Sequence, residues 1–169
     1  MPTPFGTYVL REALAVAAFN AACNAAYTWY LWRAAEPLRL FGPDGIALDL
    51  ATTPVVIAVL STLIGTALVR RKIADGRIAV GPGTRAHPAL RRLPRSTTGR
   101  AAAAAALAGV LLALPLLGLL PTLGDGTLTL GGAVGTKVLL TVALSLLIVP
   151  TLTWAALADT QRAVSPTAA

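Results

Sequence analysis

Four long stretches of the sequence contain no charged residue, and they constrain the fold more than any other feature. They cover residues 13–32, 50–69, 101–120 and 138–157. Each has the roughly 20 residues that a helix needs to cross a hydrocarbon layer of about 30 Å. Charged residues make up 12% of the chain, about half of the roughly 25% found in soluble domains. The sequence therefore predicts a single-domain, all-α membrane protein whose four transmembrane helices form an antiparallel up-down bundle.

The orientation follows from the positively charged residues, because cytoplasmic loops retain Lys and Arg. Nine of the fourteen Lys and Arg residues lie between residues 70 and 100. We therefore expect this basic loop and both termini to be cytoplasmic. An uncleaved first helix is favoured over a signal peptide, because the apolar stretch continues to Trp32 and exceeds a usual signal segment. The compact, Arg-rich chain indicates a bacterial plasma membrane.

The basic loop, residues 70–100, is rich in Gly and Pro, which disfavour a long helix. Its expected partner is the anionic inner leaflet of the lipid bilayer, at about 1 kcal/mol for each basic residue near the surface. The alternative is an orientation signal alone. No aromatic residue separates the arginines, so nucleic acid is not an expected partner. The candidates for contact with anionic lipid are Arg70, Arg71, Lys72, Arg91, Arg92 and Arg95.

Polar residues recur every four positions in the first stretch, at Asn20, Asn24 and Thr28. This spacing puts them on one face of a helix, and polar side chains in lipid turn toward other helices or a cavity. Two interpretations remain open for this row. It forms a polar pathway, or it makes interhelical hydrogen bonds, which contribute about 0.6 kcal/mol each on average.

A second polar row has the same spacing in and before the fourth stretch, at Lys137, Thr141 and Ser145. Asp49, just before the second stretch, is expected at the same depth as Lys137. Because charges within membranes tend to pair, an ion pair between Asp49 and Lys137 is one interpretation. The other is that each side chain reaches water alone at the membrane edge. Glu12, at the inner end of the first helix, is the candidate for proton coupling.

The third stretch has no hydroxyl, amide or charged side chain, so we expect its helix at the periphery of the bundle. Within it, Ala105, Gly109 and Ala113 recur at four-residue spacing. Small residues at this spacing allow two helices to approach closely. The pattern is a candidate contact with a second copy of the chain.

Residues for catalysis are scarce. One His and one Cys exclude multi-histidine metal sites and dithiol chemistry, and neither a Gly-x-Ser-x-Gly elbow nor a phosphate-binding loop is present. We expect no catalytic residue, no metal and no cofactor. The leading interpretation is a non-enzymatic membrane protein that acts as a homo-oligomer, as an accessory subunit of a larger membrane-protein partner, or as a small permease. Two alternatives are a proton-coupled transporter or channel with a polar path along the first, second and fourth helices, and a novel membrane enzyme with an acidic outer site at Arg39, Asp44 and Asp49.

Overall fold

The computed structural model describes residues 3–35, 37–79, 90, 93–94, 96–122 and 126–164, and the chain is mostly helical. The α-helices are α1 (Phe5–Trp32), α2 (Ala47–Ala74), α3 (Thr97–Ala108), α4 (Leu114–Leu119) and α5 (Leu130–Val164). A π-helical turn, η2 (Gly109–Ala113), joins α3 to α4, and a 3-10 turn, η3 (Leu120–Thr122), follows α4. Four two-residue strands are β1 (Thr3–Pro4), β2 (Leu38–Arg39), β3 (Ile78–Ala79) and β4 (Thr127–Leu128).

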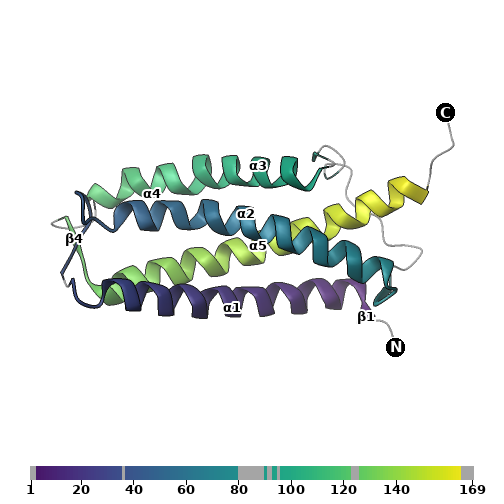
Figure 1. The fold of residues 1–169 in the computed structure, drawn as a ribbon, viewed down its shortest axis with the longest axis horizontal. Coiled ribbons are helices and arrows are strands. Elements are labelled where there is room, and N and C mark those ends of the chain that lie inside the picture. The colour runs from purple at the N-terminus through teal and green to yellow at the C-terminus, as the bar shows by residue number, and fades with distance from the viewer. Residues whose placement is uncertain are drawn as a thin grey trace.

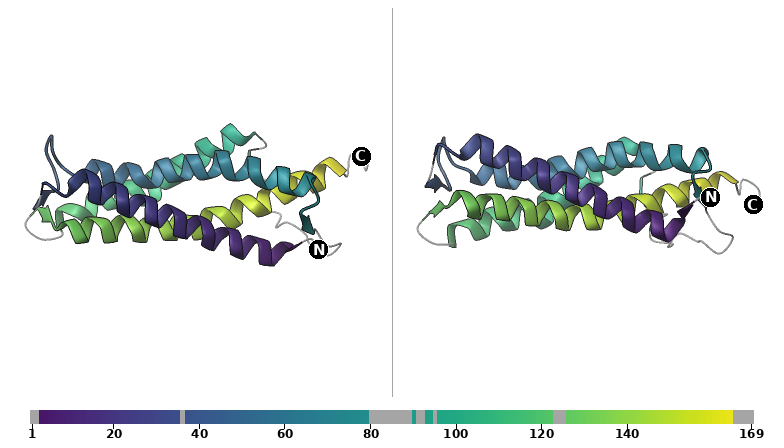
Figure 2. Two further views of the ribbon diagram at one scale, coloured as in Figure 1. Left: turned by 60° about the horizontal axis from the view of Figure 1, so that its bottom comes forward. Right: turned by 90° about the horizontal axis from the view of Figure 1, so that it is seen from below.

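The long helices lie side by side, and successive ones run in opposite directions (Figure 1). α1 packs against α5, α5 also packs against α2, and α2 packs against α3, η2 and α4. α2 and α5 are therefore central, and α1 and α3 are outer helices that each pack mainly on one neighbour (Figure 2). The predicted peripheral position of the third apolar stretch agrees with this arrangement.

Three helical segments are long and apolar enough to cross a membrane, namely Ala47–Ala74, Thr97–Thr122 and Leu130–Asp159. They contain three of the four predicted stretches and support the assignment to membrane proteins. The remaining stretch, 13–32, lies in α1, which does not reach the same apolarity in the described part of the chain. Its two Asn residues and its terminal Tyr and Trp residues lower the mean hydropathy.

The helices begin before the apolar stretches, at residues 5, 47, 97 and 130 rather than 13, 50, 101 and 138. Polar residues just outside each stretch therefore belong to the helix. Glu12, Asp49 and Lys137 are among them, so the helix backbone holds each of these side chains on a defined face.

The outer helix changes geometry at η2, immediately before Pro115. Proline lacks a backbone N–H, and its ring clashes with the carbonyl four residues earlier in a regular α-helix. The wider π turn precedes this point, and short π segments of this kind occur within α-helices. α3 and α4 therefore form one interrupted helix along α2.

The connections gather at two ends of the molecule (Figure 1). One end holds the connections from α1 to α2 and from α4 to α5, and we call it the loop end. There β2 pairs with β4 in antiparallel fashion, beside a cluster that buries Leu40, Ile46 and Leu50. At the terminal end, where both chain termini lie, β1 pairs with β3 in parallel. There the rings of Phe5 and Trp154 pack edge to face, with centroids 4.7 Å apart.

Candidate functional site in the polar core

An ion pair joins α2 to α5 near the loop end. Lys137 Nζ lies 2.8 Å from Asp49 Oδ1 and 2.7 Å from Asp49 Oδ2. The Lys137 side chain is only 1% exposed, and that of Asp49 is 21% exposed. The predicted ion pair is therefore present, and the interpretation in which Lys137 reaches water alone is wrong.

Two aromatic side chains of α1 complete this ion pair. Trp32 Nε1 donates a hydrogen bond to Asp49 Oδ2 at 3.2 Å, and Lys137 Nζ lies 4.8 Å from the centroid of the Tyr27 ring. The ring face attracts the ammonium electrostatically. These contacts compensate for the removal of both charges from water, and they join α1, α2 and α5 at one point.

The two predicted polar rows meet across the α1–α5 interface. Asn20 Nδ2 donates a hydrogen bond to Ser145 Oγ at 3.0 Å. Because α1 and α5 run in opposite directions, this contact sets Asn24 level with Thr141. Asn24 Nδ2 donates instead to the backbone oxygen of Asn20 at 3.0 Å, within its own helix.

Buried hydroxyl groups continue the polar surface along all three helices. Those of Thr28, Thr66 and Thr141 have no hydrogen-bond partner among the described residues, although the three residues are fully buried. A buried hydroxyl without a partner is unfavourable, so these three positions lower the stability of the bundle. We call the buried polar residues of α1, α2 and α5 the polar core, and its members are Thr28, Thr53, Thr62, Thr66, Lys137, Thr141, Ser145 and Thr153.

Glu12 takes part in a second ion pair, at the terminal end. Its Oε2 lies 3.0 Å from Lys72 Nζ, which also donates to Tyr8 Oη at 3.3 Å. Burial raises the pKa of the Tyr8 phenol above its usual value; the hydrogen bond from Lys72 opposes this and the Glu12 carboxylate adds to it. The three side chains connect the start of α1 to the end of α2.

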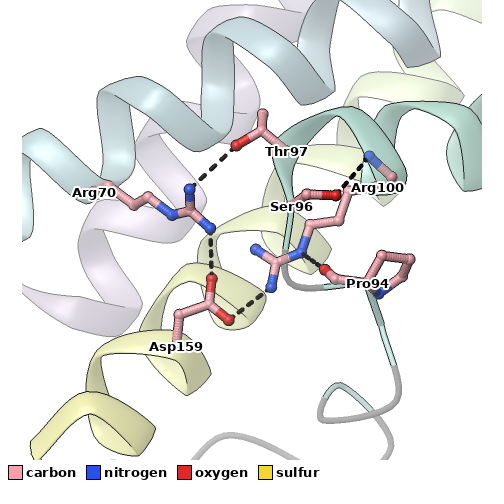
Figure 3. Close-up of polar contacts among 7 residues, drawn as sticks. Arg70, Pro94, Ser96, Thr97, Arg100 and Asp159 are labelled. Carbon is pink, nitrogen blue, oxygen red and sulfur yellow. Dashed lines mark hydrogen bonds and ion pairs between the residues drawn. The ribbon is translucent and has the colours of Figure 1, made fainter.

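A third cluster, which sequence reasoning missed, is centred on Asp159 of α5 (Figure 3). Asp159 Oδ2 lies 2.8 Å from Arg70 Nη2, and Oδ1 lies 2.7 Å from Arg100 Nη2. Arg70 Nη1 also donates to Thr97 Oγ1 at 3.1 Å, and Arg100 Nε donates to the Pro94 carbonyl at 2.8 Å. One carboxylate thus joins α2, α3 and α5. The available signal was that Asp159 is the last acidic residue and the only one after position 125.

The residues proposed for lipid contact have different surroundings. Arg70 and Lys72 are bound to carboxylates within the chain, whereas Arg71 is 81% exposed and lies 3.9 Å from an Asp75 carboxylate oxygen. Arg91, Arg92 and Arg95 lie outside the described residues.

The small-residue pattern of the outer helix does not form a free face. Ala113 is buried, and a Cβ added to Gly109 would meet Val55 of α2 at 3.9 Å. Gly109 and Ala113 belong to η2, which packs against α2, and contact of the row Ala105, Gly109 and Ala113 with a second copy stays a prediction. These small residues let α3 and η2 lie close to α2. The close packing that their spacing allows therefore occurs within the chain.

A groove of about 370 Å³ lies on the side of α3 that faces α5. Its walls are almost wholly aliphatic, with Arg100 at the terminal end. Representative lining residues are Arg100, Ala104, Leu107, Leu111, Leu144 and Ile148.

No protein-family model, curated protein or solved structure matches the chain. The residues proposed for an outer enzymatic site have separate surroundings, since Asp49 is held by Lys137 while Asp44 and the basic residue Arg39 are exposed. In the described ranges, no three His, Cys, Asp or Glu side chains converge as they would around a metal ion.

Proposed function

We propose that the chain is a four-span protein of a bacterial plasma membrane, with both termini and the basic loop in the cytoplasm. The three long apolar segments support this topology, as does the concentration of Lys and Arg between residues 70 and 100. Ion pairs that neutralise the charged side chains inside the helices support it further, because unpaired charges are unfavourable in lipid.

The first span is α1, which is not among the three segments that are long and apolar enough to cross a membrane by composition. Its 28 residues extend about 42 Å at 1.5 Å per residue, which is enough to cross the bilayer. Its Asn and Thr row faces α5 or is buried, while Leu10, Leu14, Phe19 and Leu31 are exposed on other faces. Mean hydropathy counts both faces equally, so it underestimates a span whose polar side is covered.

We further propose that the protein is not an enzyme and acts as a subunit, either of a homo-oligomer or of a complex with a larger membrane protein. The observation that carries this proposal is the open order of the helices, α1–α5–α2–α3. In a closed bundle each helix packs on two neighbours, whereas α1 and α3 each pack mainly on one. Their remaining surfaces are apolar and suited to helix association in lipid.

Native mass spectrometry of the protein, released gently from its own membrane, tests this proposal. A discrete oligomer or a stoichiometric complex with a larger protein supports it. A monomer that stays monomeric across several mild detergents, and that forms no cross-links to another protein in the membrane, contradicts it.

A second candidate function, a small proton-coupled permease, is favoured by the unpartnered hydroxyls of the polar core. Thr141 lies one turn after Lys137 in α5, and the register set by the Asn20–Ser145 contact puts Thr28 level with Lys137. Both hydroxyls would line a path with Asn20 and Ser145. The double variant Asn20→Leu and Asn24→Leu separates the two functions, with Ala22→Leu on the exposed side of α1 as the control. Loss of proton-coupled flux with normal assembly favours the permease; loss of assembly favours the subunit.

A further inference from the structure

We propose that the groove between α3 and α5 binds one anionic phospholipid, whose phosphate contacts Arg100 and whose acyl chain lies along the aliphatic walls. The groove touches the polar core at Thr62, which lines both, and it adds a ligand to the proposed subunit. It rests on the proposed membrane location of the helices, but not on the oligomeric state.

The shape of the groove fits a chain-like apolar ligand. Its volume of about 370 Å³ is within the roughly 300–1,000 Å³ usual for ligand pockets. Arg100 and Leu112 both line it, and the twelve helical steps from one to the other correspond to about 18 Å. One leaflet contributes about 15 Å of hydrocarbon, which is half of the total thickness. The groove is therefore as long as one leaflet is deep.

The terminal end of the groove supplies a hydrogen-bond donor that the chain leaves unused. The Arg100 side chain is only 2% exposed, and its Nη1 has no hydrogen-bond partner among the described residues. Figure 3 shows the other two guanidinium nitrogens bound to Asp159 and to the Pro94 carbonyl. A buried guanidinium N–H requires an acceptor, and a phosphate oxygen is a favourable one.

The charges around this donor favour an anion. Arg70 and Arg100 contribute two positive charges, and Asp159 between them contributes one negative charge. A lipid phosphate would add a negative charge beside the guanidinium group of Arg100. The terminal end is also the end that carries the basic residues 70–72, where the proposed topology puts the cytoplasmic headgroups. The polar mouth and the aliphatic walls therefore match the two parts of one lipid molecule.

The test is native mass spectrometry of delipidated protein in mild detergent, with equimolar phosphatidylglycerol and phosphatidylcholine of identical acyl chains. We expect one bound lipid per chain and a preference for phosphatidylglycerol of about tenfold, or about 1.4 kcal/mol. Both lipids carry the phosphate, but the choline ammonium of phosphatidylcholine would lie beside the guanidinium groups of Arg70 and Arg100. Arg100→Gln should abolish this preference. Ala104→Phe, which fills the groove, should remove binding of both lipids, and Ala102→Phe, exposed on the same helix, should leave binding unchanged.

Three results would overturn the proposal. The first is equal binding of the two lipids by the unaltered protein, and the second is unchanged lipid binding by Ala104→Phe. The third is displacement of phosphatidylglycerol by an equimolar free fatty acid, which would assign the groove to a carboxylate ligand. Thermal unfolding of each variant identifies any that fails to fold, and Ala104→Phe tests the groove without disturbing the Asp159 cluster. The experiment counts bound lipids per chain. A chain that binds no lipid is therefore a different result from a chain that forms no oligomer and has no protein partner.

Discussion

Lys137 and Asp49, 88 residues apart in the sequence, form a bidentate ion pair that fixes the register of α5 against α2. The two helices run in the same direction (Figure 1), so the same offset sets Thr53 level with Thr141. Apolar helix faces in lipid can slide past one another with little change in energy. A buried ion pair does not allow this, because a shift by one turn would leave both charges without partners.

The ion pair predicts a specific pattern for charge reversal. Asp49→Lys and Lys137→Asp should each destabilise the protein by about 3–5 kcal/mol, because each leaves buried like charges in place of a pair. The double variant should recover at least half of that loss, since it restores opposite charges at the same depth. Expression level and thermal unfolding in detergent measure both effects. A double variant no more stable than either single variant would contradict the assignment.

The Asp159 cluster should be more sensitive to charge removal than the Glu12 pair. Asp159→Asn leaves the buried Arg100 guanidinium without its counter-ion and should cost about 3–5 kcal/mol. Glu12→Gln affects a pair whose two side chains are both more than a quarter exposed, and water screens such pairs, so its effect should be about 1 kcal/mol or less. Chemical unfolding in mixed micelles gives the two values. Equal losses of stability in the two variants would mean that burial does not determine how much each ion pair contributes to stability.

The sequence could predict a contact between residues that lie at the same depth in the membrane. It could not predict which helices are neighbours. Depth alone paired Asp49 with Lys137, because both residues lie at the same edge of an apolar stretch. The order α1–α5–α2–α3 was not predictable, because in lipid the outer faces of the helices are as apolar as their contacts. For the same reason the spacing of Ala105, Gly109 and Ala113 suited a second copy of the chain as well as it suited α2.

The Asn20–Ser145 hydrogen bond should contribute modestly and non-additively. Asn20→Leu and Ser145→Ala should each destabilise the protein, and a double-mutant cycle should give a coupling energy of about 0.6 kcal/mol and at most about 1.7 kcal/mol. Ala18→Leu, exposed on α1, is the control and should show no coupling with Ser145→Ala. Strictly additive effects at Asn20 and Ser145 would show that the bond does not contribute.

Gly45 should be required for closure of the loop end. A Cβ at this position would lie 2.6 Å from the Leu40 carbonyl oxygen and 2.8 Å from Phe41 Cα. Both neighbours are backbone atoms, so Gly45→Ala should cost about 1–3 kcal/mol, as overpacking does elsewhere. Gly118→Ala in α4, where an added Cβ meets nothing within 4 Å, should be neutral or stabilising by about 0.5–1 kcal/mol. The unfolding temperature of Gly45→Ala should therefore fall, and that of Gly118→Ala should stay the same or rise.

The proposed topology predicts which loops react from outside the cell. In a background with Cys23→Ala, a cysteine at Asp44 is exposed at the loop end, and one at Arg77 is exposed at the terminal end. A membrane-impermeant maleimide should label Asp44→Cys in intact cells, and it should label Arg77→Cys only after the membrane is permeabilised. If α1 did not cross the bilayer, the N-terminus would lie on the side of the loop end. A cysteine at Thr7, exposed at the start of α1, should therefore follow the pattern of Arg77, and labelling of Thr7→Cys in intact cells would reduce the protein to three spans.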